Sequence, residues 1–255
     1  MQNPLDSTAA FPLFGGTRTR VAARHALLTP DGFVPSFRDG AVQATIIDHI
    51  NPALGASFVQ YSVRFLPGGK LPLPAQPSLQ RVLFIVSGNL HVGDEPLRTG
   101  NFLYLPPGTG AQLHAEAEAE ITVFEKIYQP HPDLPPPTRL VGHTADIPGV
   151  PFLGNPRALL QTLLPDRPEF DLAVNLFTYQ PGATLPFVET HIMEHGLLMT
   201  SGQGVYRLED SWYPVKQGDI IWMAPYCPQW FVAMGDTPAS YLYYKNINRL
   251  PSSHA

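Results

Sequence analysis

The chain has 255 residues, of which 44% are hydrophobic and only 15% are charged, and its formal net charge is −5. This balance gives no basic surface for nucleic acid or for an anionic membrane, so we expect neither as a partner. The single cysteine, Cys227, excludes an intrachain disulfide framework. No apolar run approaches the roughly 18–20 residues of a membrane span, and the N-terminus lacks the pattern of a signal peptide. We therefore expect a soluble, cytoplasmic protein.

The first segment, residues 1–40, is expected to be an irregular arm, with Phe11, Phe14 and Phe33 available to pack on a barrel. The whole chain carries 29 prolines and 21 glycines, which favour turns and sheet edges over helix interiors and central strands. Few stretches show the 3.6-residue periodicity of a helix. The sequence therefore predicts an all-β protein of short strands and frequent loops.

Two repeated units follow the arm, at residues 41–128 and 161–250. The run FVQYSVRFLPGG (58–69) has a counterpart in LAVNLFTYQPGA (172–183), and their Pro-Gly turns are 181 − 67 = 114 residues apart. A later pair of glycine-led segments matches at an offset of 118. Repeats of this size, with alternating apolar runs and glycine turns, predict two tandem antiparallel β-barrels.

A linker separates the two units. Residues 129–137 read QPHPDLPPP, and a proline run of this kind is extended and cannot continue a strand ladder. We therefore expect residues 129–160 to form a proline-rich linker and connector between the barrels.

The sharpest chemical signal lies in the second unit, where Glu189, His191, His195 and Gln229 are spaced as ligands of one divalent metal in a β-barrel. Glu189 and His191 are two residues apart, so on a strand they would point to the same face. His195 keeps this parity and would lie beyond a bend or on the next stretch of strand. Oxygen and imidazole donors without sulfur suit Mn(II), Fe(II), Co(II) or Ni(II) better than structural zinc.

The second unit resembles a cupin. Gly202 and Gly218 stand where the two cupin motifs have glycines, and the four ligand positions, which usually hold His, His, Glu and His, hold the four residues above. The resemblance implies a bicupin with barrels of the double-stranded β-helix or jelly-roll type. In the first unit the equivalent positions are Ala75, Pro77, Arg81 and Ala111. We therefore expect the N-terminal barrel to lack a metal and to serve a structural role.

Two further residues near the ligands receive a separate interpretation. Glu194 has the opposite parity to the ligands, so we expect it to face outward or to support them from behind. Cys227 lies two residues before Gln229 and is expected to be a small packed side chain and not a nucleophile.

The resemblance extends to a narrower family, the bicupin (S)-ureidoglycine aminohydrolases of purine (allantoin) catabolism. It is carried by the E-x-H-x3-H ligand set, the W-x-P-V-x-x-G-D stretch, the C-P-Q segment and the Y-x3-K ending, and is strongest over residues 180–249. It implies hydrolysis of a small molecule, (S)-ureidoglycine, with one Mn(II) per chain.

The resemblance also implies roles for individual residues. It assigns the metal ligands to Glu189, His191, His195 and Gln229, and substrate contacts to Glu189, Gln229, Tyr241 and Lys245. Glu189, Tyr241 and Lys245 would serve catalysis: the lysine as a charge for the substrate carboxylate, the tyrosine as a hydrogen-bond donor and the glutamate as a proton acceptor. Tyr241 and Lys245 are four residues apart, which places both on one strand face.

Two alternatives remain open from the residues alone. Another metal-dependent cupin enzyme, such as a dioxygenase or an isomerase, more often keeps the histidine-rich ligand set, so Glu189 and Gln229 argue against an iron site that activates oxygen. A non-enzymatic bicupin that binds a ligand is disfavoured by the retained four-ligand set. Self-association is common among cupins, and we expect a homo-oligomer by this analogy.

Overall fold

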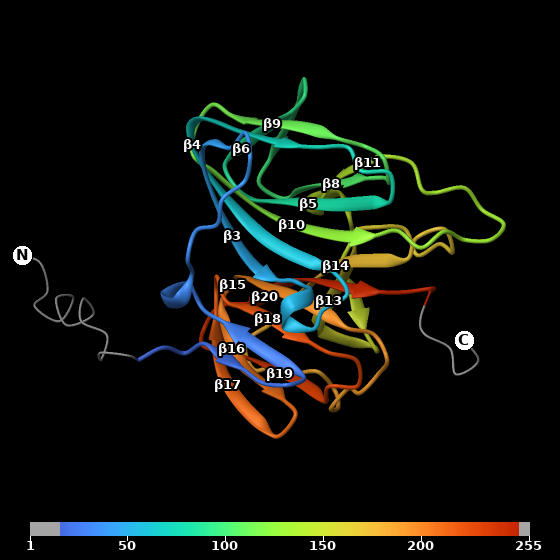
Figure 1. The fold of residues 1–255 in the computed structure, drawn as a ribbon. Coiled ribbons are helices and arrows are strands. Elements are labelled where there is room, and N and C mark those ends of the chain that lie inside the picture. The colour runs from blue at the N-terminus through green and yellow to red at the C-terminus, as the bar shows by residue number, and fades with distance from the viewer. Residues whose placement is uncertain (1–15, 250–255) are drawn as a thin grey trace, which may run out of the picture.

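The computed structural model describes residues 16–249, which form two β-barrels, one above the other in Figure 1. The helical elements of this range are three 3₁₀ turns, at Pro30–Gly32, Pro52–Leu54 and Thr144–Asp146. Among the described residues, no helix is long and apolar enough to span a membrane. The predicted all-β bicupin fold, with its low helix content, is confirmed.

The N-terminal barrel is one nine-stranded sheet in the order β11-β8-β5-β10-β4-β9-β6-β7, with β3 also paired to β4. The long strand β4 bends at Gly68, whose φ is +79°, so that its first part pairs with β3 and β10 and its last part with β9. The strands are β3 (Val42–Ile50), β4 (Val59–Leu73), β5 (Leu79–Ser87), β6 (Asn89–Val92), β7 (Glu95–Arg98), β8 (Asn101–Leu105), β9 (Ala111–Ala115), β10 (Ala119–Ile127) and β11 (Leu140–His143).

The C-terminal barrel combines an eight-stranded sheet, β1-β2-β18-β15-β20-β14-β13-β12, with a three-stranded sheet, β17-β16-β19. Its strands are β1 (Arg20–Val21), β2 (His25–Leu28), β12 (Val150–Phe152), β13 (Asn155–Thr162), β14 (Leu172–Tyr179), β15 (His195–Ser201), β16 (Gln203–Leu208), β17 (Ser211–Lys216), β18 (Ile220–Met223), β19 (Gln229–Met234) and β20 (Ala239–Asn246).

The strand registers reproduce the repeat that the sequence predicts. Phe84 of β5 faces Phe102 of β8, and Leu198 of β15 faces Ile220 of β18. The first members differ by 198 − 84 = 114 and the second by 220 − 102 = 118, which are the two offsets read from the turns. The predicted pair of repeated barrels is therefore confirmed at the level of individual residue pairs.

The two halves of the chain exchange strands. The arm before the N-terminal barrel adds a strand to the C-terminal barrel, and the connector before the C-terminal barrel adds one to the N-terminal barrel. In the arm, β2 pairs with β18 of the C-terminal barrel, and in the connector, β11 pairs with β8 of the N-terminal barrel. Arg18 strengthens the first exchange, because its guanidinium donates two hydrogen bonds of 2.7 Å to the buried carboxylate of Asp219. The arm expected to be irregular thus contains two strands. Phe33 packs against His49 at 4.6 Å between ring centroids, and Phe11 and Phe14 lie outside the described residues.

Three hydrophobic clusters hold the fold together. One fills the N-terminal barrel, one fills the C-terminal barrel, and the third lies between them. The third joins Phe58, Phe84 and Phe124 of the first barrel to Trp222 and Tyr244 of the second. Complete burial of such a side chain stabilises a fold by about 1.5–3 kcal/mol. The barrels therefore share a buried, aromatic seam and form one packed body.

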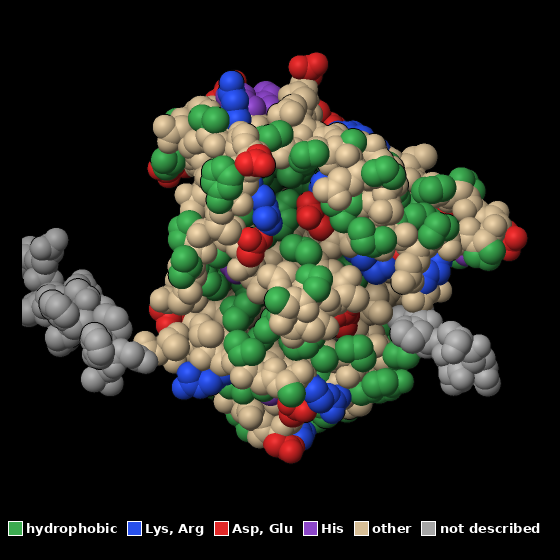
Figure 2. Space-filling view, in the orientation of Figure 1, with side chains coloured by type: hydrophobic (Ala, Val, Ile, Leu, Met, Phe, Trp, Pro, Cys, Tyr) green, Lys and Arg blue, Asp and Glu red, His purple; other side chains and the backbone are tan. Residues whose placement is uncertain are grey.

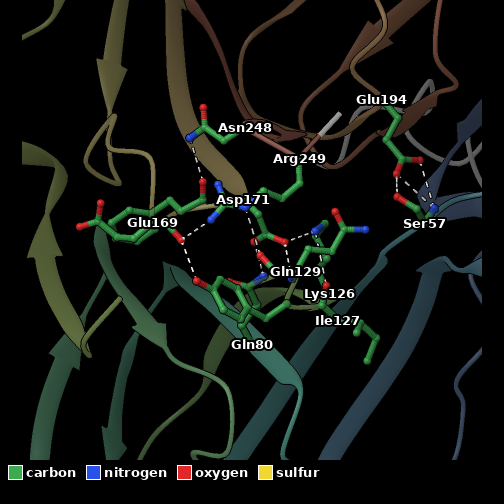
Figure 3. A network of polar contacts seen from close by, with 12 residues as sticks. Ser57, Gln80, Lys126, Ile127, Gln129, Glu169, Asp171, Glu194, Asn248 and Arg249 are labelled. Carbon is green, nitrogen blue, oxygen red and sulfur yellow. Dashed lines mark hydrogen bonds and ion pairs between the residues drawn. The ribbon is translucent and has the colours of Figure 1, made fainter. Parts of the chain in front are cut away.

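A polar network also crosses this seam (Figure 3). Asp171, which is fully buried before β14, forms an ion pair with Lys126 of β10 and accepts hydrogen bonds from the Gln80 amide at 2.5 Å and the Gln129 backbone N–H at 2.9 Å. A buried carboxylate needs such partners to offset its lost hydration. These contacts fix how the two barrels are placed against each other.

The face of the molecule seen in Figure 2 is mixed in charge. On the face drawn in Figure 2, Lys and Arg side chains are interspersed with Asp and Glu among apolar and uncharged groups. Interspersed charges of this kind keep a protein soluble and do not attract polyanions strongly.

His49 of β3 makes the stability of the fold sensitive to acid. Burial lowers the pKa of its imidazole to about 4, and its Nδ1 atom has no hydrogen-bond partner. Between pH 6.5 and 4 the unfolded chain binds a proton at this imidazole that the folded chain excludes. As the pH drops through this range, we therefore expect the free energy of unfolding to decrease by about 1.4 kcal/mol per pH unit from this group. Urea unfolding across this range should show a shallower slope for His49→Leu, and equal slopes would contradict the expectation.

Candidate metal centre and substrate cavity

The C-terminal barrel contains a cavity of about 160 Å³. All six residues that the sequence singles out for metal or substrate binding line it, among aromatic and apolar side chains. Small-molecule sites in proteins have this mixture of apolar walls and a few convergent polar groups. The lining residues are Phe152, Phe177, Glu189, His191, Met193, His195, Leu197, Tyr206, Met223, Gln229, Tyr241, Tyr243 and Lys245.

The segment that carries Glu189 and His191 is a loop and not a strand. In the N-terminal barrel β4 continues to Leu73, whereas its counterpart β14 ends at Tyr179 and regular pairing resumes only at His195. The loop is attached to β19 and the turn before it, because Glu189 and Gln229 exchange two backbone hydrogen bonds of 2.9 Å. The expectation that Glu189 and His191 share one face of a strand is therefore wrong, although His195 does begin the next strand as predicted.

The imidazole rings of His191 and His195 lie next to each other in the wall of the cavity. Nδ1 of His191 lies 3.2 Å from the carbonyl oxygen of Met193, and Nδ1 of His195 lies 3.2 Å from that of Tyr244. A carbonyl only accepts hydrogen bonds, so both Nδ1 atoms carry the proton and both Nε2 atoms present lone pairs. The two Nε2 atoms are 3.2 Å apart. Two lone pairs at this distance repel unless a cation or a donor lies between them.

Burial keeps both rings neutral. It lowers the pKa of His195 to about 3, with a further contribution from the neighbouring His191, and it also lowers the pKa of His191. Neutral imidazole is the form that binds metal ions. At neutral pH the pair is therefore ready to act as ligands without first losing a proton.

Gln229, the first residue of β19, lies beside the two imidazoles. Its amide nitrogen lies 3.0 Å from Nε2 of His191, and its amide oxygen accepts a hydrogen bond of 3.3 Å from the Tyr206 hydroxyl. Rotation of the amide by half a turn would direct the oxygen at the imidazoles and the nitrogen at the Tyr206 hydroxyl, which can also accept. Gln229 can therefore serve as an oxygen ligand without losing its partner.

Glu189 and Lys245 supply opposite charges to the same cavity. Burial raises the pKa of the Glu189 carboxyl, and the positive charge of Lys245 opposes this rise. Lys245 lies on β20 directly beside His195 on β15, and Tyr241 lies on the same face of β20. The cavity thus combines a fixed cation, a carboxyl that binds protons more readily than usual and a phenol donor.

The donor set fits a divalent metal of the nitrogen–oxygen class. Two neutral imidazoles with converging lone pairs, an amide and a carboxylate, without thiolate, match the preferences of Mn(II) and its neighbours. Across residues 16–249, however, no three His, Cys, Asp or Glu side chains are gathered as a metal site. The two imidazoles and Gln229 meet, while Glu189 lines the same cavity without joining them. The four-ligand assignment remains a prediction.

Three tyrosines that the sequence analysis missed, Tyr179, Tyr206 and Tyr243, lie close to Tyr241 and His195. The Tyr179 and Tyr241 hydroxyls are 3.0 Å apart, and the Tyr243 ring packs at 5.5 Å from that of His195. A comparison of the two repeats could have identified these tyrosines from the sequence. Where the first unit has apolar side chains at 65, 92, 121 and 123, the second unit has Tyr179, Tyr206, Tyr241 and Tyr243. Tyrosines at four positions where the equivalent barrel has apolar side chains indicate function.

The N-terminal barrel has an internal ion pair where the second barrel has its ligand and lysine. Arg81 stands at the repeat position of His195, and its register partner Glu125 stands at that of Lys245. The Arg81 guanidinium, with 3% of its side chain exposed, donates to the Glu125 carboxylate at 2.7 Å and to two backbone carbonyls. A guanidinium has no lone pair for a metal and repels one. A protein cation therefore occupies the place of a ligand in this barrel.

The expectations for Cys227 and Glu194 meet different outcomes in the structure. Cys227 is buried, and burial raises the pKa of its thiol to about 11, so it is a packed side chain as predicted. Glu194 does point away from the cavity, but it is only 3% exposed and contacts the N-terminal barrel. Of the two alternatives expected for Glu194, the outward-facing one is therefore wrong, and support of the ligands from behind agrees with these contacts.

Comparison with known proteins agrees with this architecture. The cupin domain family matches residues 175–244. The (S)-ureidoglycine aminohydrolase of Arabidopsis thaliana is 35% identical over 93% of this chain and 80% of its own, and that of Escherichia coli is 36% identical over 88% of each. This chain belongs to the (S)-ureidoglycine aminohydrolase family. It is thereby an enzyme, a hydrolase acting on a carbon–nitrogen bond.

A solved structure supports the same relationship. The chain superposes on the Escherichia coli protein Ylba with a TM-score of 0.83 and 30% identity, covering 93% of this chain and 97% of that one. Coverage of nearly the full length of both chains means that this aminohydrolase-family chain shares both barrels with its relative, and not the ligand-bearing barrel alone.

Proposed function

We propose that this protein hydrolyses (S)-ureidoglycine to (S)-ureidoglycolate and ammonia in purine catabolism, with one Mn(II) per chain. The observation that carries the proposal is the convergence of His191, His195, Gln229 and Lys245 on one cavity of the C-terminal barrel, in a chain of this family. The substrate pairs a carboxylate with an amino group on one carbon. A cavity lined by both a cation and proton-exchanging groups suits such a molecule.

The side chains divide the work by their chemistry. Lys245 pairs with the substrate carboxylate, in surroundings where water screens the attraction weakly. Tyr241 donates a hydrogen bond that orients the substrate. Glu189, whose pKa is raised by burial, accepts a proton from the attacking water and returns it to the departing amino group, which leaves as ammonia. The hydroxyl of the water takes the place of the amino group on the carbon.

His191, His195, Gln229 and Glu189 would hold the metal. When bound, a hard divalent cation supplies charge that polarises the substrate and binds its oxygen atoms. Mn(II) is proposed because the donors are nitrogen and oxygen without thiolate. Ni(II) or Zn(II) can nevertheless bind more tightly in a purified sample, because affinity follows the Irving–Williams order. Activity after reloading is therefore a better guide than the metal found on isolation.

The proposal is tested by ammonia release. The protein is stripped with a chelator, reloaded with Mn(II) or Zn(II), and supplied with (S)-ureidoglycine generated in situ because the compound is unstable. We expect Mn(II) to restore turnover above the spontaneous rate. Absence of release with either metal would contradict the proposed function, and full recovery with Zn(II) but not Mn(II) would contradict the choice of metal.

A further inference from the structure

Glu194 links the ligand loop, here residues 185–194 before β15, to the N-terminal barrel. Its side chain points away from the cavity, and its carboxylate accepts hydrogen bonds from the Ser57 backbone N–H, at 3.2 Å to each oxygen, and from the Ser57 hydroxyl (Figure 3). Its own backbone N–H donates to the Asn246 side chain at 2.8 Å. Ser57 belongs to the N-terminal barrel, just before β4, and the next residue after Glu194 is His195. One residue therefore connects a barrel without ligands to a candidate ligand.

The surrounding seam is tight at this point. A Cβ atom on Gly196 would lie 2.5 Å from the Phe58 ring and 2.6 Å from the Gln60 amide oxygen, so only glycine fits directly after His195. The Phe58 ring stacks on that of Tyr244 at 4.1 Å between centroids, and the Tyr244 carbonyl is the partner of His195 Nδ1. The N-terminal barrel thus backs the first residues of β15 on the side opposite the cavity.

Within residues 16–249, the backbone hydrogen bonds of loop residues 185–193 to other segments lie on the opposite side of the loop. Leu185 donates to the carbonyl of Phe231, Glu189 pairs with Gln229, and the carbonyl of His191 accepts from Tyr226. These partners all belong to β19 or to the turn before it. The loop therefore has one end held by β19 and the other held at Glu194. The separation between His195 and the ligands on the β19 side depends on both attachments.

We propose that Ser57 and Glu194 form a positioning pair, through which the N-terminal barrel fixes His195 and the ligand loop in the arrangement that binds the metal. This inference rests on the proposed metal centre. Residues that hold ligands in place, without binding the metal themselves, typically change metal affinity by about 10–100-fold when they are replaced. The pair gives the ligand-free barrel a direct part in the chemistry of its neighbour.

The test measures metal binding and not turnover alone. Ser57→Ala removes the hydroxyl donor, Glu194→Ala removes the acceptor, and Ser57→Thr keeps the hydroxyl as the conservative control. For each full-length variant, the Mn(II) dissociation constant is measured from the spectrum of free Mn(II), and hydrogen exchange of residues 187–195 is measured in the metal-free protein. We expect both alanine variants to bind Mn(II) about 10-fold more weakly or worse and to exchange faster, with Ser57→Thr close to the parent.

A second seam variant separates positioning from general loosening. Asp171→Asn weakens the ion pair with Lys126, which crosses the same seam away from the ligand loop. We expect it to lower the melting temperature while leaving the Mn(II) dissociation constant unchanged. A loss of Mn(II) affinity in Asp171→Asn as large as in Glu194→Ala would overturn the positioning role, since any damage to the seam would then have the same effect.

The two proposals fail in distinguishable ways. If the parent protein bound no Mn(II) at a stoichiometry of one, the proposed function and the positioning role would both fall. If the parent bound Mn(II) and released ammonia, but Ser57→Ala and Glu194→Ala bound the metal as tightly as the parent, only the positioning role would be overturned.

Discussion

Lys245→Met is expected to lower kcat/KM for (S)-ureidoglycine by about 10²–10³-fold while leaving one metal per chain. Lys245 lies beside His195 and lines the cavity, where its positive charge opposes the rise in the pKa of Glu189. In the proposed complex it pairs with the substrate carboxylate. Removal of one partner from a desolvated charge pair costs about 2–5 kcal/mol, and 1.4 kcal/mol is a factor of ten. Metal content should not change, because an ammonium group is not a ligand. Ammonia release and manganese content, measured on the same sample, check both parts.

Two further variants serve as controls for this result. Lys245→Arg keeps the charge but changes its shape, so partial activity is expected. Lys216→Met makes the same substitution at an exposed lysine on β17 of the same barrel and should behave like the parent. Near-normal release by Lys245→Met would mean that the lysine is an ordinary strand-end residue. Loss of the metal in that variant would mean that the substitution had damaged the barrel.

The double substitution His191→Ala/His195→Ala is expected to reduce bound metal from one per chain to nearly none and to abolish turnover. Both Nε2 lone pairs that converge at 3.2 Å are lost in this variant, and no other imidazole lines the cavity among the described residues. Elemental analysis of the purified protein gives the stoichiometry, and circular dichroism shows whether the barrels remain folded.

A second histidine pair provides the control. His91 and His114 lie on β6 and β9 of the N-terminal barrel, with ring centroids 6.4 Å apart. His91→Ala/His114→Ala should keep one metal per chain and normal ammonia release. Full metal content in the His191/His195 variant would contradict the proposed centre, and so would a parent protein with two metals per chain.

The repeat made most of the fold predictable. Matched Pro-Gly turns gave offsets of 114 and 118, and the same offsets relate Phe84 and Phe102 to Leu198 and Ile220 in the structure. The strand β2 was not predictable in this way. It has four residues, and the strand that it joins lies far along the chain. Local alternation cannot identify a short strand whose pairing depends on so distant a partner.

The candidate site was predictable in composition but not in backbone conformation. Glu189, His191, His195 and Gln229, which were selected by their spacing, all line one cavity. The spacing misplaced the first two on a strand, because a strand requires continuous pairing with β19 and only isolated bridges form there. For Glu194 the sequence left two alternatives open, for a related reason. Parity along the chain shows that it faces away from the cavity, but it cannot show that a second barrel lies on that side.

The strand exchange between the two halves has a consequence for synthesis of the chain. Leu28 of β2 pairs with Ile220, which is 220 − 28 = 192 residues later. At about 5–20 residues per second, the ribosome needs about 10–40 s to produce that partner after the arm has formed. The N-terminal barrel can collapse meanwhile, but it lacks β11 until the connector emerges, and the arm must wait for the last third of the protein. Docking of β2 should therefore be a late step of folding, although β2 is synthesised before every strand of the N-terminal barrel.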